Sequence, residues 1–459
     1  MPRRVRDPVG GWGAGGGVEG RGRVRVPGRF AFAGRTGTAS AGGGVFRALR
    51  VRDFRLFVLG QIVSVAGTWM MVVAQDWLVL GLTAGSASAL GTVTALQFAP
   101  LLLFTLYGGR LADRYDKRAL LTVVNVLSSV VSLALAVLVL SGEVRLWHVY
   151  VFASVLGVVN SVEVPTRMAF VGELVGSDLL PNASALSAAY FNVARVVGPA
   201  LAGLFISAAG VGWVMLVNAA SYTATVVALR LMRGGSARAP RRGDRVRVWD
   251  GLKAAGRFDL AVPLVLVAVV GLFGLNFQLT LPLLAAQVHH ADASTFGVVT
   301  AVFAAGSLVA ALMTTMRRGR PSAGLVAGAA IGFGVLETAV GVVSSYGPSM
   351  VLLFLTGGAA IYFAQAANHR VQLGVPPELR GRVLALYTLI LQGSTPLGAL
   401  LVGSLAEHWG VRWGFAAGGL VSLAAGLTAV AAGRGGRTGA VPADSVARER
   451  EASEERARS

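Results

Sequence analysis

The sequence contains no cysteine among its 459 residues. Catalysis by a thiol, disulfide bonds, cysteine-ligated zinc and iron–sulfur clusters are therefore excluded. Lysine is nearly absent too, since the chain holds Lys117 and Lys253 alone, and neither follows a glycine. A Walker A loop needs a Gly-Lys-Ser or Gly-Lys-Thr run, so this chain is not its own P-loop ATPase. Any work that it does must be driven by an ion gradient or by a partner.

Charged residues are scarce as well. They make up 14% of the chain, against roughly 25% in an average soluble protein, while 54% of residues are hydrophobic. The mean hydropathy is +0.65. Since crossing a bilayer takes about 20 apolar residues per helix, this composition predicts a membrane protein. Apolar runs predict twelve spans, over residues 54–82, 87–108, 119–141, 147–170, 183–208, 212–232, 260–285, 293–316, 322–344, 348–372, 382–405 and 412–432.

The net charge of +19 is unevenly placed. Basic residues cluster before the first span and after the second, sixth, eighth and tenth, whereas the loops after the odd-numbered spans carry none or one. By the positive-inside rule, this alternation predicts that both termini and the loop over residues 233–259 are cytoplasmic. It also accounts for most of the charge, so we expect no nucleic-acid partner.

The chain divides around that basic loop. Residues 1–44 and 433–459 are polar, without apolar runs, and we expect them to be disordered tails. The segments 45–232 and 260–432 each hold six predicted spans. A repeat with an offset of 200 relates Leu201, Gly203, Gly210, Val211 and Trp213 to Leu401, Gly403, Gly410, Val411 and Trp413. A duplicated six-helix unit is a transporter organisation.

The loop between the second and third spans carries the strongest motif. Residues 109–118 read Gly-Arg-Leu-Ala-Asp-Arg-Tyr-Asp-Lys-Arg, in which Gly109 would permit close helix approach and Asp113 could accept hydrogen bonds. This stretch resembles the signature loop of the major facilitator superfamily, with Asp116 where a second glycine is usual. The alternative is an ordinary charged turn.

The resemblance implies an all-α membrane protein with twelve transmembrane helices in two six-helix halves. It also implies that the loop joins the halves at the cytoplasmic face, where Asp113 meets the start of the eleventh span. We assign this gate motif to Gly109, Leu111, Asp113, Arg114, Lys117 and Arg118, together with Glu163 and Arg167 from the fourth span.

Further stretches resemble the exporters related to the enterobactin exporter. The residues involved are Glu163-x-Pro165-x-Arg167, Gly172 to Val175, Leu180 to Ala183, Asn192-x-x-Arg195, and Pro377 to Val383. In the fifth span, Gly198, Pro199 and Gly203 are similar to the antiporter motif, although Ala202 replaces one of its glycines. The partial match favours antiport and leaves uniport open.

Ionisable residues inside the spans are expensive and indicate function. Asp76 and Glu337 are the candidates for proton coupling; the alternatives are a hydrated interfacial carboxylate for Asp76 and a packing role for Glu337. We expect Glu163 to pair with the charged loop rather than to bind substrate. Arg195, near mid-membrane, must pair with a carboxylate, with carbonyls or with an anionic substrate. At 1.5 Å per residue it lies roughly 10 Å deeper than Asp76, so we expect no direct pairing between them.

Polar residues also recur at helical spacing. Because the first, fourth, seventh and tenth spans line the central cavity in the superfamily, the resemblance assigns cavity or substrate roles to Gln61, Thr68, Asn276, Gln278, Tyr362, Gln365 and His369. Asn192 and Arg195 of the fifth span are further cavity or substrate candidates. The alternative is hydrogen bonding between helices. Side chains of the adjacent His289 and His290 diverge, and we expect neither a metal site nor a cofactor.

These observations predict a multi-pass transporter of the cell membrane that exports a small organic molecule, such as a siderophore, drug-like compound or secondary metabolite. We expect proton antiport by alternating access, with protons, substrate and lipid as partners of a monomer. The alternatives are an uptake or uniport carrier and a non-transporting scaffold or sensor. A membrane-embedded enzyme would need clustered catalytic groups, and the five histidines are scattered.

The predicted topology can be tested because the chain has no cysteine of its own. Single cysteines replacing Ser86, Asp292 or Ser345 should react in intact cells with an impermeant thiol reagent. A cysteine replacing Gly243 should react only after the cells are lysed. Labelling of the Gly243→Cys variant in intact cells would overturn the orientation.

Overall fold

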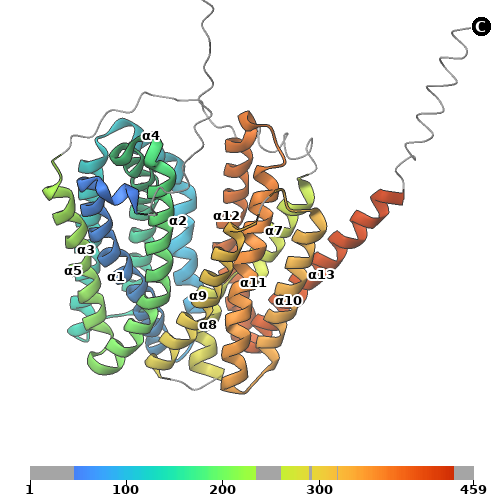
Figure 1. Cartoon of the computed structure of the whole chain (residues 1–459). Helices are drawn as coiled ribbons and strands as arrows, with labels where there is room; N and C mark the ends of the chain where they lie inside the picture. The colour runs from blue at the N-terminus through green and yellow to red at the C-terminus, as the bar shows by residue number, and fades with distance from the viewer. Residues whose placement is uncertain (1–45, 234–259, 289–291, 318, 439–459) are drawn as a thin grey trace, which may run out of the picture. The chain divides into compact units, whose positions relative to one another are not determined.

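The computed structural model describes residues 46–233, 260–288, 292–317 and 319–438, and their regular elements are all helices (Figure 1). The tail over residues 1–44, most of the central loop, His289, His290 and Gly243 lie outside these ranges. The N-terminal half holds η1 (Arg47–Arg50), α1 (Arg52–Leu82), α2 (Ala87–Arg114), α3 (Lys117–Leu140), α4 (Leu146–Ala209) and α5 (Val211–Leu231). The C-terminal half holds α7 (Ala261–Phe273), α8 (Phe277–Leu283), η2 (Leu284–Val288), α9 (Ala293–Thr315), α10 (Ala323–Val342), α11 (Tyr346–Gln372), α12 (Pro377–Trp409) and α13 (Val411–Thr438).

Eleven helical segments of the described chain are long and apolar enough to cross a membrane. One of them, α4, has 64 residues, which corresponds to about 96 Å and is far more than one span needs. It is divided at Gly176, where the backbone takes a φ of 72° and a ψ of 175°. Glycine reaches this region without steric cost because it has no Cβ. With α4 read as the predicted fourth and fifth spans, the helices are consistent with a twelve-span architecture.

The predicted seventh span is interrupted. Helix α7 ends at Phe273 and α8 begins at Phe277, although the apolar run continues through the gap. A Cβ on Gly274 would lie 2.6 Å from the Phe333 ring and 2.9 Å from Oε2 of Glu337. Any larger residue at position 274 would collide with these two side chains of α10, so glycine is required there. Hydrophobic periodicity carries no sign of such a break.

The internal repeat is visible in the backbone. Gly210, between α4 and α5, has a φ of 91°, and Gly410, between α12 and α13, has a φ of 92°. Each glycine ends one helix and allows the next to begin at once. Helix α13 continues to Thr438, six residues into the segment expected to be a tail (433–438).

The same repeat joins the two halves. A Cβ on Gly203 of α4 would lie 2.6 Å from the carbonyl oxygen of Ala293, where α9 begins. A Cβ on Gly403 of α12 would lie 3.0 Å from the carbonyl oxygen of Ala87, where α2 begins. Small residues thus let backbones from opposite halves approach closely, as in other packed membrane helices. We call this the closed end of the bundle, and the other end, where α2 ends at Arg114, the basic end.

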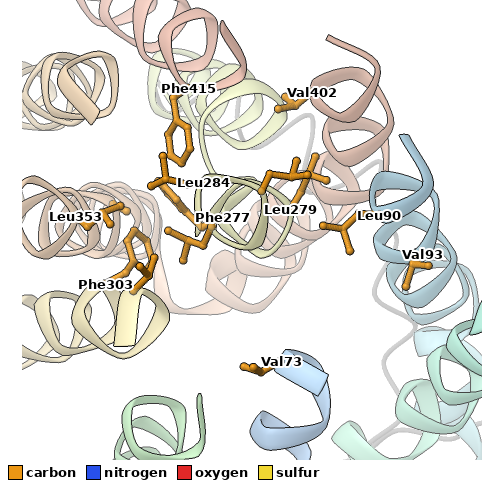
Figure 2. Packing of buried hydrophobic residues seen from close by; sticks show 14 of the residues in the cluster. Val73, Leu90, Val93, Phe277, Leu279, Leu284, Phe303, Leu353, Val402 and Phe415 are labelled. Carbon is orange, nitrogen blue, oxygen red and sulfur yellow. The ribbon is translucent and has the colours of Figure 1, made fainter. Parts of the chain in front are cut away.

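Several aromatic rings pack together within the main apolar core. Phe277 of α8 packs against Phe303 of α9, with ring centroids 4.2 Å apart, and against Phe333 of α10 at 6.0 Å. Figure 2 shows Phe277 among side chains from α9, α11 and α13, with Val73 of α1 and Leu90 of α2 facing the same region. The core therefore runs from one half into the other.

A carboxylate from one half caps a helix of the other at the closed end. Oε2 of Glu407, in the last turn of α12, accepts hydrogen bonds from the N–H of Ala87 at 2.5 Å and of Ser88 at 3.1 Å. The hydroxyl of Ser86 donates to the same oxygen at 3.2 Å. Negative charge at a helix N-terminus is stabilised by the free N–H groups and the helix dipole. Sequence reasoning assigned no role to Glu407.

Removing this cap should loosen the first turn of α2. Loss of an N-terminal cap costs about 0.5–2 kcal/mol, so Glu407→Ala should speed hydrogen–deuterium exchange over residues 87–90 by about 2- to 30-fold. Glu143→Ala, a change at an exposed acid between α3 and α4, is the matched control. Equal exchange in the two variants would contradict the capping role.

Candidate functional site

A cavity of about 360 Å³ lies between the two halves. The N-terminal half contributes α1, α2 and α4, and the C-terminal half contributes α8, α9, α11 and α12, together with Leu275 of the break. Its wall is mainly apolar and rich in aromatic rings, namely Trp69, Phe98, Phe277, Phe296 and Phe303. Such a concave, mostly apolar site with a few polar groups is the form that small-molecule sites take.

One cation lines the cavity. The guanidinium of Arg195 lies 5.6 Å from the centroid of the Trp69 ring, which attracts it through the negative face of the indole. Neither an ion pair nor a hydrogen bond of this guanidinium is found among the residues that the structure describes. The Gly-Pro motif shapes this place, because a Cβ on Gly198 would lie 2.6 Å from that of Trp69, and Pro199 lines the cavity itself.

One carboxylate lines the same cavity. Asp76 of α1 is 6% exposed, and within the described ranges it makes no hydrogen bond or ion pair through its side chain. Counting residues along the spans placed Asp76 near the outer interface and Arg195 near mid-membrane. In the structure, both side chains line one cavity. No ion pair joins them, which agrees with that depth count.

Several other predicted cavity residues make hydrogen bonds within their own helix or to a neighbouring helix instead. Besides Arg195, Gln278 is the predicted polar candidate that lines the cavity. The others do not line it, and most are held by hydrogen bonds: Gln61 to Thr225 and Arg167, Thr68 to Ser64, Asn192 to Ala188, Asn276 to Leu272, Tyr362 to Arg317 and Gln365 to Thr314. His369 also lies away from the cavity wall. Hydrogen bonding between and within helices therefore accounts for most of this polar set.

Sequence reasoning missed part of the wall. Thr300, Ser307, Gln392 and Thr395 add polar groups from α9 and α12. These helices correspond to the eighth and eleventh spans, which the resemblance did not assign to the cavity. The polar pair Gln392 and Thr395, three residues apart in an apolar run, was an available signal.

The charged loop at the basic end makes its contacts within the N-terminal half. Nζ of Lys117 lies 2.5 Å from Oε1 of Glu173, and both side chains are nearly buried, at 10% and 9% exposed. Arg118 donates to the carbonyl oxygen of Met232 at 2.9 Å, at the end of α5. The loop thus binds α4 and α5. Asp113 is exposed and forms no ion pair or hydrogen bond with the described residues, the start of α12 included.

Two expectations for this loop need correction. Glu163 pairs with Arg167, at 3.5 Å, and not with the loop. The loop takes Glu173 instead, because α4 stays helical through residues 171–175 and carries that carboxylate to Lys117. Close helix approach is made by Gly108, whose missing side chain admits the backbone of Ser161, whereas a Cβ on Gly109 would meet open space.

Comparison with known proteins agrees with this geometry. Residues 43–444 match the family of major facilitator proteins described as transmembrane secretion effector. The chain belongs to this family. It is 27% identical to the multidrug efflux pump Tap of Mycolicibacterium fortuitum, covering 82% of this chain and 94% of that protein. It is 26% identical to the staphyloferrin A transporter of Staphylococcus aureus, covering 80% and 93%. The crystal structure of the nucleoside transporter NupG has the same fold, with a TM-score of 0.69 at 12% identity, covering 83% and 98%.

Glu337 of this major facilitator protein lies away from the cavity. It is 3% exposed, and its Oε2 has no hydrogen-bond partner among the described residues. A Cβ on Gly274 or Gly418 would lie 2.9 Å or 3.1 Å from its carboxylate oxygens, so the side chain fills the space between the break after α7 and helix α13. This position fits the packing alternative for Glu337.

The ion pair and the exposed aspartate of the loop should respond differently to neutralisation. Glu173→Gln leaves Lys117 buried without its counter-charge, which should lower the free energy of unfolding by about 3–5 kcal/mol. Asp113→Asn should change it by less than about 0.5 kcal/mol, as for most surface substitutions. Denaturant titration in mixed micelles measures both, and similar losses in the two variants would contradict the assignment.

Proposed function

We propose that this transporter exports a small organic molecule from the cell and that proton entry drives the export. The observation that carries the proposal is the cavity bounded by both halves, whose wall includes Asp76 and Arg195 without an ion pair between them. Two relatives, a multidrug efflux pump and a staphyloferrin A transporter, support export of a small organic molecule.

The wall chemistry favours an amphipathic cargo. Aromatic rings and aliphatic side chains bind apolar groups, and the Trp69 ring leaves one side of the Arg195 guanidinium for a polar or anionic group. Siderophores, drug-like compounds and secondary metabolites fit this description. A cavity with few polar groups binds through shape and apolar area more than through a fixed hydrogen-bond pattern.

The contacts between the halves support alternating access. Backbones pack closely at the closed end, and the Glu407 cap adds charge-assisted hydrogen bonds there. At the basic end, Asp113 is available to bind the start of α12 when that end closes. Two such sets of contacts, made alternately, would let substrate shift the population between two states. We place the basic end and both termini in the cytoplasm, as the distribution of arginines predicts, and expect a monomer in the cell membrane.

Proton coupling falls to Asp76. A coupling group must bind a proton in one state and release it in the other. Of the three acids predicted within spans, Glu163 is paired with Arg167 and Glu337 is packed behind the cavity wall. Asp76 alone of these three lines the cavity, where access to water changes as the halves move.

Neutralising Asp76 should separate coupling from substrate movement. The cargo is first found as the compound that accumulates in cells lacking the transporter. In proteoliposomes, Asp76→Asn should abolish the acceleration of export by an imposed pH gradient and keep downhill exchange of that compound near the wild-type rate.

Glu337→Gln serves as the matched control and should keep the response to the pH gradient. If Asp76→Asn still responds to the gradient and Glu337→Gln does not, the coupling residue is Glu337. If no compound moves in wild-type liposomes, the chain is a scaffold or sensor and the export proposal fails.

A further inference from the structure

A second cavity, separate from the central one, opens on the side of the C-terminal half. It has a volume of about 410 Å³ and is lined by α9, α10 and α11. Helices α9 and α10 each pack along α11, which forms the floor between them (Figure 1). We call it the lateral groove.

Each helix contributes one stripe of small or apolar residues. On α9 the stripe includes Gly306, Ala310 and Met313, with the spacing of one helical face. On α11 it includes Phe354, Gly358 and Tyr362 with the same spacing. The Tyr362 hydroxyl is the one polar side-chain group on the groove wall. A site so apolar within the span takes hydrocarbon and not a polar solute.

Glycine creates the space. A Cβ on Gly332 of α10 would meet nothing within 4 Å, so the groove is open at this point and not filled by a neighbouring side chain. The backbone of α9 at Gly306 touches that of α11 at Phe354, which closes the floor. Val309 and Met313 beside the groove are 44% and 63% exposed, so it faces the surroundings of the helix bundle. For a membrane-spanning helix those surroundings are lipid.

The guanidinium of Arg317 lies at the mouth of the groove. Arg317, just past the end of α9, donates from Nη1 to the Tyr362 hydroxyl at 2.6 Å. The partner is neutral, and within the described part of the chain no carboxylate pairs with this exposed guanidinium. Basic residues beside a pocket between transmembrane helices attract anionic lipid headgroups.

We propose that the lateral groove binds one anionic phospholipid, with an acyl chain along the glycine-lined floor and the headgroup phosphate on Arg317. Tyr362 holds the guanidinium at the mouth, and the apolar stripes exclude a polar ligand from the interior. The site is independent of the cargo proposed above, since it shares no lining residue with the central cavity.

The test is native mass spectrometry of the purified full-length protein with phosphatidylglycerol or phosphatidylcholine. Wild type should retain one phosphatidylglycerol in preference to phosphatidylcholine. Gly332→Leu fills the groove and should abolish retention, whereas Gly328→Leu, one turn away on the same helix and equally open, should not. Ala329→Leu, which also fills the groove, replaces Gly332→Leu if that variant does not fold.

A separate substitution tests the contact between Arg317 and the lipid headgroup. Arg317→Gln should weaken retention of phosphatidylglycerol about five-fold, since one arginine near an anionic lipid contributes about 1 kcal/mol. Arg412→Gln, at an exposed arginine of the closed end, should leave retention unchanged. Equal retention of the two lipids by wild type, or equal loss in Gly332→Leu and Gly328→Leu, would overturn the proposal.

Discussion

The bilayer cannot solvate a polar group, and this constraint explains most of the structure. Backbone N–H and C=O groups must be satisfied within each span, so the regular elements of the described chain are all helices. Lipid also supplies no hydrophobic force between helices, so packing depends on close contact at small residues such as Gly203 and Gly403. An unpaired ionisable group within a span is therefore costly unless it faces a cavity or a partner. Arg195 and Asp76 both line the cavity between the halves.

Sequence reasoning predicted the spans well because apolar length and helix ends are local properties. The start of α10 at Ala323 and the end of α1 at Leu82 lie within a residue of the predicted bounds. The break at Gly274 was not predictable, since it depends on Phe333 and Glu337 from another helix. Depth counting predicted no direct pair between Asp76 and Arg195, in agreement with the structure, but it could not show that both line one cavity, because rise along a helix says nothing of how the helices are arranged around it.

The errors in the charged loop have a similar origin. Its sequence motif identified the turn correctly, yet partner choice depended on how far α4 remains helical. Because that helix continues to Gly176, Glu173 reaches Lys117, and Glu163 is left to Arg167 one turn away. The motif therefore identified the charged turn, while contacts in three dimensions determined which acid pairs with which base.

The two seams between the halves have similar backbone contacts, but the helices that begin there are capped by different acidic residues. Gly203 meets the start of α9, and Gly403 meets the start of α2, so the two seams between the halves are related by the repeat. Helix α9 is capped by its own Asp292, whose pKa is lowered by the Thr295 N–H and by the Ser294 and Thr295 hydroxyls. Helix α2 has its own Ser86 but also takes Glu407 from the other half. Separating α2 from α12 would therefore break charge-assisted hydrogen bonds, while the α9 cap would survive separation from α4. Within the described residues, the charge-assisted hydrogen bonds that join the halves at the closed end thus lie at the α2–α12 seam.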